Sequence, residues 1–262
     1  SDVYKRQGLR YCSCRACAAY RHRHILHLMT MDLLWGGLTF APGRGFPLST
    51  DSMVLADFVR LPRAARVVDL GSGGGLLGLL LCGKAPDCTV TGVELQAEAH
   101  QAALDNIARN RLDRLSSILG DLRQVRTLLP GGVFSSVVSN PPYFSGGLPS
   151  AGVAGPQARQ ERTCTLSDVY EAAAWLLRFG GDCFLVHRPE RLADLMALGR
   201  QWRLEPKRMQ LVRHKPDAPA SLVLLQCRRG AKPGLCLLPD LILFHADGSP
   251  TSRYREIYHI GD

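Results

Sequence analysis

An apolar run that ends in an acid and leads directly into a glycine-rich turn restricts this chain to few folds. Residues 66–70 read Arg-Val-Val-Asp-Leu and residues 71–75 read Gly-Ser-Gly-Gly-Gly. The apolar residues 76–82 follow and favour a helix. Because glycines let a backbone turn sharply and approach a ligand closely, this segment predicts a strand, a ligand-binding turn and a helix of an α/β fold.

The chain continues to alternate between strand and helix patterns. Five apolar runs are predicted strands of a parallel sheet: 66–70, 89–94, 116–121, 134–139 and 181–187. Predicted helices lie between or after them: 76–82, 97–110, 166–179 and 191–202. Two last runs, 208–213 and 221–227, are joined too closely for a helical crossover and should pair antiparallel. The pattern predicts a doubly wound α/β fold whose seven-stranded sheet is mostly parallel with one reversed strand.

The glycine turn fits two kinds of nucleotide site. Residues 73–78 match the dinucleotide pattern Gly-x-Gly-x-x-Gly, which alone is a weak signal and leaves the preceding acid unexplained. In the register Asp69-x-Gly71-x-Gly73-x-Gly75, the acid faces a cation. S-adenosylmethionine carries an ammonium and a sulfonium where a dinucleotide carries a pyrophosphate, so this register favours S-adenosylmethionine.

Acids also end the next two predicted strands. Glu94 is placed to accept hydrogen bonds from ribose hydroxyls, and Asp121 is placed to bind the adenine amine of the cofactor. Either acid alone is equally compatible with an N-cap of the following helix. Three acids at the ends of three successive strands favour a cofactor site.

Asn140-Pro141-Pro142-Tyr143, after the fourth predicted strand, indicates methyl transfer to a planar nitrogen. The exocyclic amine of adenine is a poor nucleophile because its lone pair is delocalised into the ring. The Asn140 side-chain oxygen and the Pro141 carbonyl can accept both amine hydrogens, which lets the nitrogen become more tetrahedral as it attacks. Both prolines fix φ at about −65° and stiffen the arm, and Tyr143 offers a flat face for a flipped-out base. We expect these four residues to be catalytic.

Composition favours a single domain with a polyanionic partner. The 262 residues are 46% hydrophobic and 21% charged, with a formal net charge of +9. A basic balance of this size favours nucleic acid as a partner. No apolar run has the length of a bilayer span, and the nine scattered cysteines are typical of a reduced, cytoplasmic protein.

The first thirty residues differ from the rest. They contain closely spaced cysteines and histidines, but the spacing fits neither common zinc-finger pattern, so no metal is expected. We expect residues 1–30 to be a non-native or disordered leader with Met29 or Met31 as the start. Residues 31–262 are then a single S-adenosylmethionine-dependent methyltransferase domain.

Further segments flank these motifs: 32–38, 45–58, 92–96, 158–161, 234–239 and 247–258. On the motifs and these flanking segments, the chain from about Met31 to Tyr258 resembles the bacterial tRNA(Val) adenine-N6 methyltransferases. The Asn-Pro-Pro-Tyr motif alone is shared with glutamine, rRNA and DNA methyltransferases, and the flanking segments indicate the narrower family. Pro47 and Thr50 depart from its usual pattern.

The resemblance implies a Rossmann-like class I methyltransferase fold. It implies methylation of the N6 amine of adenine in tRNA(Val) at position 37, 3′ to the anticodon, with S-adenosylmethionine as cofactor and tRNA as partner, and with neither membrane nor metal. The candidate cofactor-binding residues are Asp69, Gly71, Ser72, Gly73, Gly75, Glu94, Leu95, Asp121, Leu122 and Asn140.

Other functions stay open at this point. An rRNA or protein glutamine methyltransferase would share the core, although glutamine methyltransferases usually carry a helical domain ahead of the glycine turn. A DNA methyltransferase needs a larger target-recognition region than the loop 145–162. A nucleotide-dependent oxidoreductase or a non-catalytic RNA-binding protein is the alternative from another class, and the intact Asn140 argues against the latter.

Two features outside the motifs concern the substrate. A basic concentration surrounds the reversed hairpin: Arg200, Arg203, Lys207, Arg208, Arg213, Lys215, Arg228 and Arg229. It is expected to follow tRNA phosphates, although a solvated basic face is nearly as compatible. The loop 145–162 is expected either to close over the flipped base or to be a plain surface connection.

Overall fold

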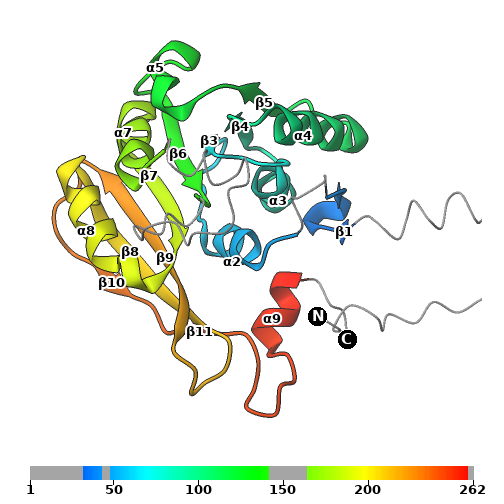
Figure 1. The fold of residues 1–262 in the computed structure, drawn as a ribbon, viewed down its shortest axis with the longest axis vertical. Coiled ribbons are helices and arrows are strands. Elements are labelled where there is room, and N and C mark those ends of the chain that lie inside the picture. The colour runs from blue at the N-terminus through cyan, green and yellow to red at the C-terminus, as the bar shows by residue number, and fades with distance from the viewer. Residues whose placement is uncertain (1–31, 43–47, 142–163, 259–262) are drawn as a thin grey trace, which may run out of the picture. The chain divides into compact units, whose positions relative to one another are not determined.

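The computed structural model describes residues 32–42, 48–141 and 164–258 (Figure 1). The predicted leader 1–30, Pro142, Tyr143 and the loop 145–162 lie outside the described residues, so what was expected of them stays a prediction. None of the helices in the described ranges combines the length and apolar character needed to cross a membrane.

A nine-stranded sheet forms the centre of the fold (Figure 1). Its strands are β3 (Arg66–Leu70), β4 (Thr89–Glu94), β5 (Leu115–Leu119), β6 (Phe134–Ser139), β7 (Leu177–His187), β8 (Leu204–Arg213), β9 (Ala220–Arg229), β10 (Cys236–Leu237) and β11 (Leu241–Ile242). The order is β10-β8-β9-β7-β6-β3-β4-β5, with β11 also paired to β8. A separate antiparallel pair joins β1 (Asp32–Leu33) to β2 (Thr39–Phe40).

The strand directions confirm the predicted topology. Every pair within β7-β6-β3-β4-β5 is parallel, whereas β9 runs antiparallel to both of its neighbours, β7 and β8. The seven predicted strands with one reversed strand are therefore present. The short strands β10 and β11 extend the sheet by pairing parallel to β8.

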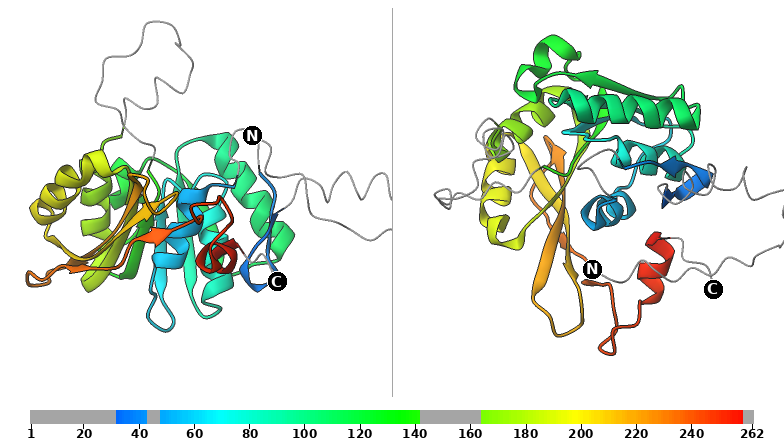
Figure 2. Two further views of the ribbon diagram at one scale, coloured as in Figure 1. Left: turned by 90° about the horizontal axis from the view of Figure 1, so that it is seen from below. Right: turned by 45° about the vertical axis from the view of Figure 1, so that its right-hand side comes forward.

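Helices cover both faces of the sheet (Figures 1 and 2). They are α2 (Thr50–Phe58), α3 (Leu76–Lys84), α4 (Ala97–Asn110), α5 (Val125–Leu128), α7 (Leu166–Leu176), α8 (Leu192–Gln201) and α9 (Ser252–Tyr258), with the short 3-10 turns η2 (Trp35–Gly37), η3 (Leu122–Gln124) and η4 (Pro189–Arg191). α2 and α3 share one buried core with Val67, whereas α7 and α8 share the other with Val68. Because successive strand residues point to opposite faces, adjacent valines of β3 serve two separate cores.

The predicted third strand, 116–121, ends at Leu119, so Asp121 lies two residues beyond it. Two further strands begin four residues before their predicted starts, for local reasons. The helix predicted over 166–179 ends at Leu176, and β7 begins at Leu177, four residues before the predicted strand. Glycines hide this strand start: Gly180 adopts φ +77°, which L residues rarely adopt. Likewise β8 begins at Leu204 rather than at residue 208. The earlier start was not predicted because Pro206 argues against a strand in the sequence. In the structure, Pro206 lies beside a register shift between β8 and β9.

Helix starts follow from the sequence more directly. α7 begins with a capping box, in which the Thr165 hydroxyl accepts the Asp168 backbone N–H and the Asp168 carboxylate accepts the Thr165 N–H. α3 instead begins at a glycine in the left-handed region, Gly75, with φ +83°. The parallel strands β3, β4, β5 and β6 place their carboxyl ends at one edge of the sheet, where α3 begins.

Candidate active site

The glycine turn at the end of β3 has a backbone that only glycine adopts readily. Gly71, Gly73 and Gly75 have φ of +72°, +54° and +83°, in the left-handed region where a Cβ is disfavoured. The carbonyl of Val93, in the neighbouring strand β4, accepts the N–H groups of Gly71 and Ser72 at 2.9 and 3.2 Å. These two hydrogen bonds hold the beginning of the turn against β4. The three predicted glycines occupy the left-handed positions of the turn.

Glu94 joins this turn to the beginning of α4. One carboxylate oxygen accepts the Gly73 N–H and the other accepts the Gln96 N–H, both at 2.8 Å. The residue is 7% exposed. Since each carboxylate oxygen has two acceptor lone pairs, Glu94 retains capacity for further donors such as the ribose hydroxyls for which it was predicted.

Asp69 lies beneath the turn and is 2% exposed. Its Oδ2 and the Ser72 Oγ are buried and find no hydrogen-bond partner within the described part of the chain. Burial first, and then the charge of Glu94, raise the pKa of Asp69 to about 8. A cation above the turn would stabilise both carboxylates, which fits the ammonium and sulfonium of S-adenosylmethionine and not a pyrophosphate.

Asp121 has a local role as well as a predicted one. It is the N-cap of η3, where its Oδ1 accepts the Arg123 N–H at 2.9 Å. Its carboxylate also pairs with the Arg123 guanidinium, and this hydrogen bond lowers the pKa of Asp121. In the structure, Asp121 therefore acts as the N-cap that the sequence also allowed. Binding of the cofactor's adenine amine by Asp121 stays a prediction. Leu122, the next candidate, is half-buried in η3.

Apolar side chains are exposed beside these acids. Leu95, which follows β4, is 44% exposed, and Leu119, at the end of β5, is 49% exposed. Leu119 is the register partner of Glu94. The two leucines thus expose apolar surface at the carboxyl edge of the sheet. Leu119 was missed in the sequence, because a strand-end leucine there looks like any core residue.

Asn140 follows β6, the neighbour of β3 opposite to β4. The last residue of β6, Ser139, donates its hydroxyl to the Leu70 carbonyl at 2.7 Å and fixes the two strand ends together. The Asn140 Nδ2 donates to the Ser52 Oγ of α2 at 3.1 Å, and Pro141 is buried. The arm therefore leaves the sheet beside the glycine turn. Ser52 was also missed, since nothing in the sequence links it to a residue 88 positions away.

Residues 48–196 match the family model of the methyltransferase small domain. The tRNA1(Val) (adenine(37)-N6)-methyltransferase of Dickeya chrysanthemi is 33% identical over 78% of this chain and 83% of its own length. The corresponding protein of Aeromonas hydrophila is 28% identical over 80% of this chain and 87% of its own. The chain belongs to this methyltransferase family.

Solved structures support the fold of the family member. A predicted O-methyltransferase from Agrobacterium tumefaciens superposes with a TM-score of 0.66 at 23% identity, covering 80% of this chain and 96% of that one. A precorrin-6y C5,15-methyltransferase from Geobacter metallireducens gives a TM-score of 0.53 at 13% identity, over 72% and 94% of the two chains. The Rossmann-like class I methyltransferase fold predicted from the sequence is confirmed.

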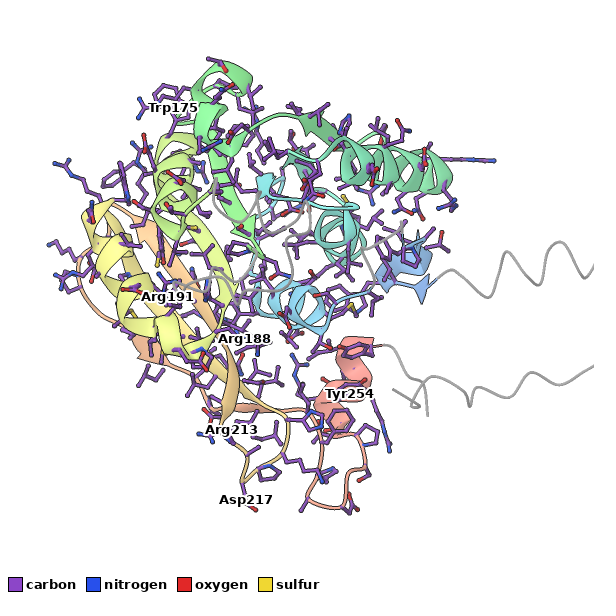
Figure 3. All side chains as sticks on the ribbon, viewed as in Figure 1. Trp175, Arg188, Arg191, Arg213, Asp217 and Tyr254 are labelled. Carbon is purple, nitrogen blue, oxygen red and sulfur yellow. The ribbon has the colours of Figure 1, made fainter. Side chains whose placement is uncertain are left out.

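The predicted basic concentration is distributed differently from the expectation. Three of its arginines are held in ion pairs: Arg200 with Glu205, Arg213 with Asp240, and Arg228 with Asp182. Arg213 lies at the carboxyl end of β8, toward the hairpin turn that carries Asp217 (Figure 3), whereas Arg228 and Arg229 lie at the other end of the hairpin. The hairpin therefore presents two smaller groups of cations, and their contact with phosphates stays a prediction.

Proposed function

We propose that this family member transfers a methyl group from S-adenosylmethionine to the N6 amine of an adenine in tRNA, at position 37 of tRNA(Val). The observation that carries the proposal is the position of Asn140. It stands at the end of β6, next to a glycine turn with two buried acids, in a chain that is 33% identical to an enzyme named for this reaction. Of the alternatives, a dinucleotide oxidoreductase would bring a pyrophosphate to Asp69 and Glu94, where negative charge is disfavoured.

The cofactor would lie over the glycine turn. S-adenosylmethionine supplies, when bound, an electrophilic methyl group on a positively charged sulfur. Gly71, Gly73 and Gly75 let the backbone approach it without a Cβ in the way, and Asp69 contributes negative potential from beneath. Glu94 would hold the ribose and Asp121 would bind the adenine amine, as predicted, and Leu95 would lie against the adenine. These roles rest on the positions of the side chains along one edge.

Asn140 and Pro141 would orient the target amine. Two carbonyl acceptors, the Asn140 Oδ1 and the Pro141 C=O, favour an amine whose lone pair is withdrawn from the ring and directed at the methyl carbon. Held in this way, the nitrogen lone pair would form the new N–C bond as the C–S bond breaks and a neutral thioether leaves. The amine then loses one proton to solvent. Orientation and preorganised acceptors supply the rate enhancement, with Tyr143 as the proposed stacking surface.

The decisive experiment is nucleoside mass spectrometry of unmodified tRNA incubated with the protein and deuterated-methyl S-adenosylmethionine. We expect labelled N6-methyladenosine in tRNA(Val). A tRNA(Val) transcript with guanosine at position 37 is the matched control and should acquire no label. Labelled adenosine in the control transcript would reject position 37, and labelled product on rRNA or a glutamine peptide in place of tRNA would reject the substrate.

A tRNA substrate also gives a proposed location. Because bacterial tRNAs and their precursors are present in the cytoplasm, we propose that the enzyme acts there. The formal net charge of +9 fits such a partner.

A further inference from the structure

The first turn of α2 contacts the catalytic arm through one side chain. Ser52 is 7% exposed and lies one turn from the helix N-cap, Ser49. Its Oγ accepts a hydrogen bond from the Asn140 Nδ2 at 3.1 Å, and the Asn140 side chain makes no other hydrogen bond to the described residues. The orientation of the Asn140 carboxamide is therefore set by a serine on a different element.

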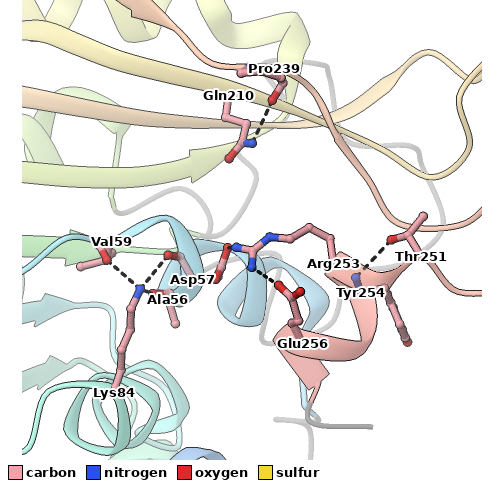
Figure 4. A network of polar contacts seen from close by, with 10 residues as sticks. All are labelled: Ala56, Asp57, Val59, Lys84, Gln210, Pro239, Thr251, Arg253, Tyr254 and Glu256. Carbon is pink, nitrogen blue, oxygen red and sulfur yellow. Dashed lines mark hydrogen bonds and ion pairs between the residues drawn. The ribbon is translucent and has the colours of Figure 1, made fainter. Parts of the chain in front are cut away.

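α2 is fixed at both ends, so the Ser52 hydroxyl is a firm anchor. At the C-terminal end, the Lys84 ammonium donates to the carbonyls of Ala56, Asp57 and Val59 at 2.8, 2.6 and 2.8 Å (Figure 4). Arg253 of α9 pairs with the Asp57 carboxylate at the same end. Such contacts on both the backbone and a side chain limit movement of the helix along its axis.

The N-terminal end of α2 is held by the other end of α9. The Tyr258 hydroxyl donates to the Thr50 hydroxyl at 2.9 Å, across 208 positions of sequence. Ser49 caps the helix by accepting the Ser52 N–H at 3.2 Å. α9 thus runs antiparallel to α2, and the turn that carries Ser52 is restrained independently of Asn140.

We propose that Ser52 is a positioning residue for methyl transfer: it holds the Asn140 carboxamide with Nδ2 toward α2 and Oδ1 toward the substrate amine. This inference rests on the proposed function. The terminal torsion of an asparagine has broad, roughly two-fold preferences, so an unanchored carboxamide would present its NH₂ donor to the amine in part of the population. A serine hydroxyl in a helix can donate its own proton to a carbonyl of the preceding turn, which leaves its oxygen as an acceptor for Nδ2.

The test compares Ser52→Ala with the matched control Ser49→Ala. Loss of one neutral hydrogen bond should lower the single-turnover rate constant of methyl transfer by about 3- to 10-fold, with unchanged affinity for S-adenosylmethionine and tRNA. Ser49→Ala removes the cap of the same helix and lowers thermal stability, but the Ser52 hydroxyl remains, so kcat should fall less than in Ser52→Ala. If both variants lose activity equally, α2 acts only as a scaffold and the proposal is overturned.

A double variant tests whether Ser52 acts through Asn140. Ser52→Ala should cost nothing further in an Asn140→Ala background, because the group that it positions is gone. The same fold-loss in both backgrounds would overturn the proposal. This comparison separates positioning from a general effect of the substitution on folding.

A spectroscopic measurement separates this inference from the proposed function. The side-chain ¹⁵NH₂ resonances of Asn140 can be assigned as the pair missing from Asn140→Ala. They should shift more in Ser52→Ala than in Ser49→Ala, whichever substrate the enzyme methylates. Unshifted resonances in Ser52→Ala would overturn the positioning contact, whereas absence of methylated tRNA with the wild-type protein would overturn the proposed function alone.

Discussion

The cofactor half and the acceptor half of the site are built in different ways. The cofactor half, at the ends of β3 and β4, is local: a turn of five residues adopts three left-handed glycine conformations and is tied to Glu94 through the Gly73 N–H. The acceptor half joins Asn140 to Ser52 across 88 positions, and α9 reaches α2 across 208. Backbone geometry specifies the first half, and tertiary packing assembles the second.

The largest effect should come from breaking the local half. Gly73→Val places a β-branched residue at φ +54° and disturbs the N–H that Glu94 accepts. We expect loss of measurable S-adenosylmethionine binding by calorimetry, on the order of 10²-fold or more in affinity. Gly132→Val is the matched control, because Gly132 also has positive φ, +73°, with open space around it. Undiminished affinity in Gly73→Val would refute the cofactor assignment.

A substitution in the acceptor half should lower kcat rather than the affinity for S-adenosylmethionine. Asn140→Ala removes an acceptor whose interaction strengthens as the amine attacks, so kcat should fall on the order of 10²-fold with little change in S-adenosylmethionine affinity. Asn110→Ala offers a control, since Asn110 hydrogen-bonds the backbone of Thr39 away from the strand ends. That variant should lose stability and keep kcat. A near-normal methylation rate in Asn140→Ala would contradict the proposed mechanism.

The comparison also explains what the sequence could reveal. Asp69, Glu94 and the glycines were found because left-handed backbone needs glycine at fixed spacing and parallel strands end at one edge. Ser52 and Leu119 were not identified as candidate site residues from the sequence. A buried helical serine and a strand-end leucine are placed at a site only by neighbours that are distant in sequence. The same reason applies to β7, whose first residues follow α7 without a break and contain two glycines.

Tyr143 gives a smaller test of the acceptor half. If its ring stacks on the flipped adenine, Tyr143→Ala should weaken tRNA binding by roughly 1 to 3 kcal/mol, while S-adenosylmethionine affinity stays unchanged. Tyr143→Phe keeps the ring face and is the matched control, so it should retain most activity. Binding isotherms and single-turnover rates measured together distinguish the two variants. Equal losses in both would show that the hydroxyl, and not the ring, is required.

The smallest effect concerns the pH dependence of the cofactor half. Burial and Glu94 raise the pKa of Asp69 to about 8 in the ligand-free protein, so this carboxyl is mostly protonated at pH 7. A bound cation favours the carboxylate and lowers that pKa, so binding below pH 8 must release a proton. S-adenosylmethionine affinity should therefore rise with pH and level off above about 8, gaining roughly 10-fold between pH 7 and 9 from this group.

Asp69→Asn isolates that contribution, because titration of the ligand's own amine is common to both proteins. The variant should bind less tightly at pH 9 and show a flatter affinity profile, measured by calorimetry in buffers of different ionisation enthalpy. It should also be relatively more stable at high pH. A carboxyl whose folded pKa is raised contributes stability below its unfolded pKa of 3.8 that is lost as pH rises through about 8. Identical affinity profiles in the two proteins would mean that cofactor binding does not depend on the charge of Asp69, and that the turn, rather than the acid beneath it, selects the cation.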